Sequence, residues 1–377
     1  MSDDAERLAR AALSRLAEPG DPRLTGLVAE LGAPRLHELL VRERDPGGML
    51  TDVAARLASS DPERELDRAR RLGLRFVIPS DEEWPGQVGD LVLAGTMHER
   101  GGPPIGLWVR GPLRLDSLRG SVAIVGARSA TGYGTQVAGE LAAVTARSGR
   151  PVISGAAFGI DQAAHRGAIA MDAPTVAVLA CGADRVYPAA HQQLIEHIAT
   201  TGAVVSEAPP GCAPTRIRFL ARNRLIAALS RGTVVVEAAA RSGALNTAGW
   251  AARLNRLVLG VPGPVTSPLS QGVHHLLRQG AASLVTSGQE VLEMVGESGA
   301  GLAAEPRGET RARDRLSSRH RQVLDAVPVA HAAPTDSVAR TAGLGVVEVR
   351  SALSYLLRTG LVVQDDDGWR LAALAQT

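Results

Sequence analysis

The stretch that decides the fold reads Ser121-Val122-Ala123-Ile124-Val125-Gly126-Ala127-Arg128-Ser129-Ala130-Thr131-Gly132-Tyr133-Gly134. Its four apolar residues, 122–125, are typical of a strand that is buried on both faces. The small residues after them predict a tight turn that opens a helix, and the backbone N–H groups of such a turn attract anions. The spacing differs from the G-x-G-x-x-G dinucleotide fingerprint, which argues against NAD.

The same unit recurs downstream. Stretches of helical length separate further short apolar runs at 152–154, 175–179, 203–205, 233–236, 257–261 and 283–285. This alternation predicts an α/β fold with a Rossmann-like, doubly wound, mostly parallel sheet. Two earlier strands are expected at 74–78 and 107–109.

Three further regions lie outside the sheet domain, which we place at 71–297. Residues 1–70 show helical spacing and predict an N-terminal helical domain. Residues 298–316 are rich in Gly, Ala, Glu and Arg and predict a linker. Residues 317–377 predict a winged-helix domain, with helices at 319–326, 335–342 and 346–359 before a hairpin.

The winged helix can serve DNA or a protein partner. Its third helix offers only Arg350 and Arg358, and the hairpin turn beside it carries Asp365, Asp366 and Asp367. DNA readout usually requires a more basic helix. Both roles stay open for this domain.

The composition excludes some classes of enzyme. The chain has 377 residues, a net charge of +2 and a pI of about 8.8, and all 41 of its Lys and Arg residues are Arg. P-loop ATPases and pyridoxal enzymes rely on a lysine, so both are disfavoured. Contacts to phosphate must come from arginine, backbone N–H groups or hydroxyls.

We expect no metal, no cofactor and no membrane segment. Cys181 and Cys212 are the only cysteines and form no metal-type pair, and His274-His275 lacks supporting ligands. No apolar run reaches the roughly 18 residues of a membrane helix, and the N-terminus lacks a signal stretch. A cytoplasmic location is therefore expected.

Three glycine-rich turns follow strands of the predicted sheet. Arg128 lies at the carboxyl end of the first strand, where open α/β sheets bind ligands. Ser154, Gly155 and Gly159 belong to the second turn, and Ser242-Gly243 to the third. Because these strand ends meet at one sheet edge, we predict that the turns present backbone N–H groups to phosphates there.

Asp161 ends the second turn and is predicted to accept N–H bonds at the start of the next helix. A hydrolytic pair of Asp161 with His165 is the alternative. We disfavour it because the sequence shows no Ser or Cys nucleophile with its own elbow signature.

The densest basic stretch within the sheet domain runs from Thr215 to Ile226 and holds four arginines around Phe219. We expect Arg222 and Arg224 to contact phosphates. A base stacked on Phe219 is one interpretation. We favour the other, in which Phe219 belongs to the core of a helix with a basic face.

Several segments, in order, resemble the DNA-processing protein A (DprA/Smf) family. They span about 75–290 and comprise 125–128, 154–161, Tyr187-Pro188, Arg222-Asn223-Arg224-Leu225-Ile226, Ser242-Gly243-Ala244 and Val261-Pro262-Gly263. The resemblance implies an extended Rossmann-like DNA-binding domain between a sterile-alpha-motif-like N-terminus and a winged-helix C-terminus.

The resemblance also implies a function. Such a protein binds and protects single-stranded DNA without catalysis and helps load the recombinase RecA during natural transformation. It is cytoplasmic and homodimeric, with an interface expected here near 247–254 and 273–279. In the family, the arginine that matches Arg128 lines the DNA pocket. A basic residue that often follows the Tyr-Pro pair is Ala189 in this chain, and Arg185 is a nearby substitute.

The predicted phosphate-binding set is therefore Gly126, Arg128, Ser154, Gly155, Gly159, Arg185, Arg222, Asn223, Arg224, Ser242 and Gly243. Two other functions stay open. One is a nucleotide-binding enzyme related to the phosphoribohydrolases, although Glu237 and Pro262-Gly263-Pro264 fit that pattern poorly. The other is a protein–protein adaptor with an inert sheet domain.

Overall fold

The computed structural model describes residues 2–42, 61–297 and 312–373. The chain forms two compact units, Met1–Ala303 and Ala304–Thr377. Most of the predicted linker, 298–311, lies outside the described residues, and its last part forms the short 3-10 helix η5 (Ala312–Arg315). Within the described ranges, no helix has the length and apolar character to cross a membrane.

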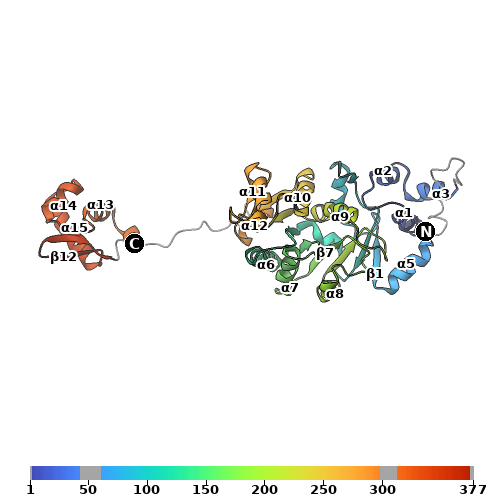
Figure 1. Ribbon diagram of the computed structural model, residues 1–377, viewed down its shortest axis with the longest axis horizontal. Helices are drawn as coiled ribbons and strands as arrows, with labels where there is room; N and C mark the ends of the chain where they lie inside the picture. Colours follow the sequence, from blue (N-terminus) through green and yellow to red (C-terminus); the bar gives the residue numbers. More distant parts are fainter. Residues whose placement is uncertain (1, 43–60, 298–311, 374–377) are drawn as a thin grey trace. The chain divides into compact units, whose positions relative to one another are not determined.

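The first unit is built on a sheet with helices on both faces (Figure 1). Its nine strands have the order β1-β4-β8-β7-β6-β5-β9-β10-β11. β4 pairs antiparallel with β1 and β8, and the remaining neighbours are parallel. This confirms the predicted doubly wound, mostly parallel fold. The strands are β1 (Leu74–Val77), β4 (Leu107–Arg110), β5 (Val122–Val125), β6 (Val152–Ser154), β7 (Thr175–Leu179), β8 (Ala203–Ser206), β9 (Gly232–Val235), β10 (Leu257–Gly260) and β11 (Ser283–Leu284).

The strand order reverses at β5. Val122 of β5 pairs with Val152 of β6 on one side and with Gly232 of β9 on the other. Helix α6 (Gly132–Arg147) follows β5 and packs on one face of the sheet, whereas α10 (Gly243–Arg253) follows β9 and packs on the opposite face. The chain therefore diverges between the carboxyl ends of β5 and β9, which is where open α/β sheets hold ligands.

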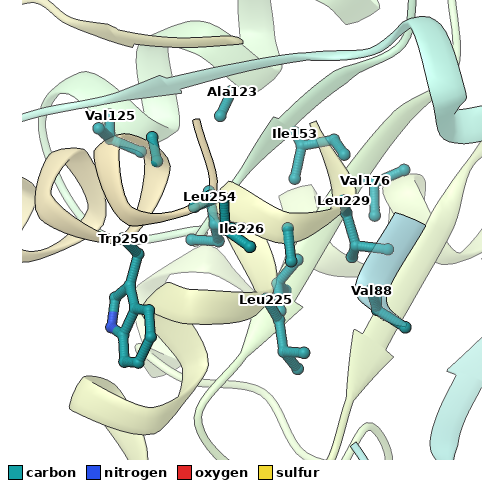
Figure 2. Close-up of a cluster of buried hydrophobic side chains, with 14 of the residues drawn as sticks. Val88, Ala123, Val125, Ile153, Val176, Leu225, Ile226, Leu229, Trp250 and Leu254 are labelled. Carbon is teal, nitrogen blue, oxygen red and sulfur yellow. The ribbon is translucent and has the colours of Figure 1, made fainter. Parts of the chain in front are cut away.

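Each face of the sheet has its own core because side chains alternate along a buried strand. Val122 and Ile124 pack with α6, α7 (Ile160–Ile169) and α12 (Gly288–Val295). Ala123 and Val125 pack with α9 (Arg216–Leu229) and α10. Figure 2 shows this second core, in which α9 contributes Leu225, Ile226 and Leu229.

In the described ranges, four helices precede the sheet: α1 (Ser2–Ser14), α2 (Pro22–Leu31), α3 (Ala33–Arg42) and α5 (Pro62–Arg71). Ala11 of α1 and Leu66 of α5 share a hydrophobic cluster with Phe76 and Trp108 of the sheet. The N-terminal helices therefore belong to the same compact unit as the sheet. The unit also contains α8 (Gln192–Thr201), α11 (Gln271–Arg278) and the hairpin of β2 (Thr96–Met97) and β3 (Arg100–Gly101).

The described part of the second unit, after η5, has three α-helices and a hairpin, as predicted for the C-terminal region. These are α13 (Ser318–Ala326), α14 (Thr335–Ala342), α15 (Val346–Arg358), β12 (Val362–Asp365) and β13 (Gly368–Leu371). Val323, Leu353 and Trp369 are among the residues of its core.

Gly167 is required for the close packing of α7 on α6. A Cβ at this position would overlap the backbone carbonyl oxygen of Gly139 in α6. Gly167→Ala should therefore lower the free energy of unfolding by about 1–3 kcal/mol, because the two helices must separate. Urea unfolding followed by circular dichroism measures this change.

Gly139→Ala is the matched control, since it adds the same methyl group on the facing helix. The nearest atom to its Cβ, the Ala163 carbonyl oxygen, lies 3.9 Å away. This variant should keep or raise stability, by up to about 1 kcal/mol, because alanine favours a helix over glycine. Equal losses in the two variants would contradict the packing argument.

Candidate functional site

A pocket of about 680 Å³ opens at the carboxyl ends of β5 and β9, at the point where the strand order reverses. Three segments form most of its wall: the turn after β5, the start of α9 and the turn before α10. Its lining residues are Val125, Gly126, Ala127, Arg128, Ser129, Ala157, Asp161, Pro214, Thr215, Arg216, Phe219, Leu220, Arg222, Asn223, Ile226, Ala239, Arg241, Ser242, Gly243, Ala244, Thr247 and Leu269.

The charge of this pocket is strongly positive. Its lining contains Arg128, Arg216, Arg222 and Arg241 but only one carboxylate, that of Asp161. The first, second and fourth of these arginines are exposed, and none of them forms an ion pair with a residue in the described ranges. A site of this charge attracts an anion.

Arg222 forms the floor of the pocket and is only 7% exposed. Within the part of the chain that the structure describes, its Nε has no hydrogen-bond partner. Burial lowers the pKa of Arg222, and the nearby charge of Asp161 opposes that shift. A buried guanidinium with an unmet N–H is costly, so the floor of the pocket favours an anionic ligand.

Gly155 makes room for this arginine. A Cβ at Gly155 would overlap the guanidinium of Arg222, so glycine is required for the close approach. Gly155 itself is buried and does not line the pocket. The absence of a side chain at Gly155 lets the guanidinium of Arg222 approach the backbone of the second turn closely.

Asp161 occupies the N–H groups of the second turn. Its Oδ2 accepts hydrogen bonds from Gly155 N at 3.1 Å and Ala157 N at 3.4 Å. Burial raises the pKa of this carboxyl, and the charge of Arg222 opposes the shift. The prediction that Asp161 accepts backbone N–H bonds is confirmed, although the donors precede α7 and Gly159 is the N-cap. Because these N–H groups bond to Asp161, they are not available to a phosphate as we had predicted.

Glycines also allow the first two turns to pack closely, because a Cβ at these positions would overlap the neighbouring turn. Gly159 has φ +74°, and a Cβ there would overlap the carbonyl oxygen of Ala127. A Cβ at Gly126 would lie 2.5 Å from Cγ1 of Ile160. Ser154 is buried, and its Oγ donates to Ile124 O at 2.7 Å. Of these predicted site residues, only Gly126 lines the pocket.

The structure separates the arginines of α9. Arg224 is fully buried, and its Nη1 and Nη2 donate to the two carboxylate oxygens of Glu207, each at 2.7 Å. It lies outside the pocket lining, so its predicted contact with phosphate has no support in the geometry. Arg185 is exposed and also lies outside the lining.

The third turn joins the pocket as predicted. Asn223 of α9 donates from Nδ2 to Gly243 O at 3.3 Å and to Asn246 Oδ1 at 3.1 Å. Ser242 caps α10 by accepting a hydrogen bond from Ala244 N. Asn223, Ser242 and Gly243 all line the pocket. These contacts hold the start of α10 against α9.

Phe219 is a pocket residue, and the expectation that it lies in the core is wrong. It is half-buried and belongs to none of the hydrophobic clusters of the described residues. The guanidinium of Arg128 lies 4.9 Å from its ring centroid, that of Arg222 lies 5.8 Å away, and the ring of Tyr187 lies 5.7 Å away. Cations that approach an aromatic ring in this way are attracted by its π-electrons.

Arg216 and Arg241 are pocket residues that sequence reasoning did not select. Arg241 follows β9, at the same edge of the sheet as Arg128. The rule that ligands bind at the carboxyl ends of strands was therefore a usable signal for it. Arg216 begins α9, and its position on the pocket side of that helix depends on how α9 packs.

The residues expected of a hydrolase are engaged elsewhere. His165 Nδ1 lies 2.9 Å from Thr175 Oγ1 and forms no hydrogen bond with Asp161. Glu237 accepts from Thr131 N and Oγ1 at the start of α6 and does not line the pocket. Burial raises the pKa of the Cys181 thiol to about 11. In the described ranges, no cluster of three or more His, Cys, Asp or Glu residues is placed to hold a metal ion.

The fold and this pocket define a Rossmann-like α/β protein with a cationic site at the switch point of its sheet. The family model described as DNA recombination-mediator protein A matches residues 75–296. The chain is also 43% identical over 371 residues to the putative DNA processing protein DprA of Mycobacterium tuberculosis. The matched region covers 98% of this chain and 95% of that protein. The chain belongs to the DprA/Smf family of DNA processing proteins, as its motifs predicted.

Two solved structures agree with this assignment. DNA processing protein A of Streptococcus pneumoniae matches with a TM-score of 0.62 and 29% identity, covering 76% of this chain and 96% of that one. The Helicobacter pylori protein, described for its single-stranded DNA binding mode, matches with a TM-score of 0.51 and 28% identity. That match covers 58% of this chain and 94% of the other.

His165 makes the stability of this protein depend on pH. Thr175 Oγ1 donates to Val152 O at 2.7 Å, so His165 must carry its hydrogen on Nδ1 and donate to Thr175. Burial lowers the pKa of His165 to about 3, from 6.5 in the unfolded chain. The folded protein therefore resists protonation of His165, whereas the unfolded chain takes up the proton below pH 6.5. The contribution of neutral His165 to the free energy of unfolding is complete above pH 6.5, and it falls by about 1.4 kcal/mol for each pH unit between pH 6.5 and about pH 3.

His165→Asn keeps a donor near the Nδ1 position and removes the titrating ring. Its free energy of unfolding should therefore decline less steeply than that of the wild type between pH 6.5 and pH 4. Urea titrations at several pH values measure both slopes. Identical slopes would show that His165 does not control acid stability.

Proposed function

We propose that the pocket binds the sugar-phosphate backbone of single-stranded DNA and catalyses no reaction on it. The observation that carries this proposal is the buried Arg222, whose Nε lacks a partner among the described residues on the floor of a cationic pocket. The solved relative from Helicobacter pylori is described as a single-stranded DNA binder. The engagement of Glu237 and His165 in structural hydrogen bonds argues for binding without catalysis.

The arginines divide the work of binding. Arg128, Arg216 and Arg241 at the rim are exposed and free to follow a mobile phosphate chain. Arg222 is held in place and favours a phosphate that enters the pocket. Phe219 offers an aromatic surface to a base, which is how proteins bind single strands without reading their sequence.

The biological role that we propose is DNA processing during natural transformation. The protein protects an incoming strand and hands it to a RecA-type recombinase in the cytoplasm. Membership of the DprA/Smf family supports this proposal.

We also propose a homodimer. β11 lies at the edge of the sheet, and its Leu284 is 56% exposed, so this edge offers an apolar surface to a second copy. The side of α10 that carries Thr247, Trp250 and Ala251 is buried within its own chain, and the outer side of α11 is available.

Sedimentation velocity should show a dimer that Leu284→Asp shifts toward monomer, and an unchanged dimer would exclude this edge.

The winged-helix unit has features that favour a protein partner. Val347, in the first turn of α15, is 82% exposed. The hairpin turn beside this helix carries Asp365, Asp366 and Asp367, which repel a DNA backbone. We therefore propose that this unit contacts a protein while the pocket holds DNA.

Arg128→Ala tests the proposed pocket. Fluorescence anisotropy with a labelled oligo-dT over a salt series should show binding that is at least about tenfold weaker, because both a phosphate contact and the cation at Phe219 are lost. The slope of log K against log salt should shrink by about 0.7, as expected for one lost phosphate contact on a single strand.

Arg119→Ala is the matched control. Arg119 is exposed and precedes β5, so it lies at the amino end of the strands, away from the pocket. The Arg119→Ala variant should bind oligo-dT with the affinity of the wild type. Wild-type protein that is folded and fails to bind at low salt would overturn the proposed function. Equal weakening in both variants would place the DNA outside the pocket.

A further inference from the structure

Helix α9 carries four arginines, and acidic side chains form ion pairs with two of them. Arg216 and Arg222 line the pocket. Arg218 and Arg224 are paired with Glu18 and Glu207. The number of cations that the helix offers to a ligand therefore depends on these two carboxylates.

Three hydrogen bonds, two of them to Glu18, fix the guanidinium of Arg218. Arg218 Nε donates to Glu18 Oε2 at 2.7 Å, and Nη2 donates to Oε1 at 2.8 Å. Nη1 donates to Ala213 O at 2.5 Å. All three nitrogens of Arg218 therefore have a partner, two of them on Glu18 and one on the backbone of Ala213.

The N-terminal helices bring Glu18 to this position. It lies in the turn between α1 and α2, next to Gly20, whose carbonyl accepts a hydrogen bond from Gly101 N at 2.9 Å. A Cβ at Gly20 would lie 3.0 Å from Nε of Arg224, so the turn packs closely on α9. This turn is thus the contact through which the N-terminal region meets the helix that forms the pocket.

The two ion pairs differ in how readily they open. The side chains of Arg224 and Glu207 are 0% and 9% exposed, so breaking this pair leaves a charge buried. The side chains of Arg218 and Glu18 are 15% and 38% exposed. The carboxylate of Glu18 is thus open to solvent, so another anion can reach this pair and replace Glu18, whereas the buried pair of Arg224 is closed to it.

Arg218 does not itself line the pocket, but it lies beside the pocket wall in the first turn of α9. Its Nη1 donates to the carbonyl oxygen of Ala213, and the next residue, Pro214, lines the pocket. The backbone N–H of Arg218 bonds to the side chain of Thr215, which also lines the pocket. A phosphate at this end of α9 competes with Glu18 for the guanidinium.

We propose that Glu18 withholds Arg218 from the DNA and so holds the affinity of the pocket below what its arginines allow. This inference rests on the proposed function. It gives the N-terminal helical region a role in DNA binding that involves no contact of its own with the strand. Glu18 is then a positioning residue, because it acts through Arg218.

A double-mutant cycle tests this role by anisotropy with oligo-dT in a salt series. Glu18→Gln should bind about threefold to tenfold more tightly, with a salt slope steeper by about 0.7, because one further phosphate contact forms. Arg218→Ala should stay within about twofold of the wild type, since Arg218 is withheld in it. The double variant should bind like Arg218→Ala.

Glu38→Gln is the control for the change in charge. Glu38 pairs with Arg35 and Arg42 within α3, in the same N-terminal region. It should leave both affinity and salt slope unchanged. Thermal unfolding of all variants establishes that each is folded.

The outcomes separate this inference from the proposed function. If Glu18→Gln and Arg218→Ala both weaken binding, the pair only holds α9 in place and the inference is wrong. It is also wrong if Glu18→Gln binds like Glu38→Gln while the wild type binds tightly. A folded wild type that does not bind oligo-dT overturns the proposed function and this inference together.

Discussion

The site depends on the burial of one guanidinium. Arg222 lies beneath the pocket, against Gly155 and in the field of Asp161, with its Nε unpaired among the described residues. Burying such a group costs free energy that folding must supply elsewhere. The two cores on either side of the sheet provide that stabilisation, and the one that contains Leu225, Ile226 and Leu229 packs α9 against the strands. A phosphate in the pocket would supply a hydrogen-bond acceptor for Nε of Arg222.

Glycines set the geometry around this arginine in a way that differs from a phosphate-binding loop. In such a loop, glycine lets a ligand approach backbone N–H groups. Here Gly126 and Gly159 let two turns approach each other, and Gly155 lets a side chain approach a turn. Asp161 satisfies N–H groups of the second turn. The positive charge of the pocket therefore comes chiefly from side chains, which suits a flexible strand bound without sequence preference.

Acidic residues outside the pocket lining shape its charge. Glu207 pairs with Arg224 in the interior, and Glu18 pairs with Arg218 at the boundary with the N-terminal helices. The remaining arginines, Arg128, Arg216, Arg222 and Arg241, line one concave surface. A chain with a net charge of only +2 can thus present a strongly cationic site, because the opposite charges are used in ion pairs elsewhere.

The sequence by itself determined the sheet, because buried parallel strands leave a periodic apolar signal and strand ends mark a ligand-binding edge. It also placed Arg128 and Ser242 at that edge, and both line the pocket. Only the tertiary structure decided that Arg222 lines the pocket while Arg224 is paired with Glu207, and that Phe219 faces the pocket. These outcomes depend on the rotation of α9 and on partners remote in sequence, such as Glu18, which lies 200 residues from Arg218. Local periodicity carries no information about such contacts, since they form only when separate elements pack together.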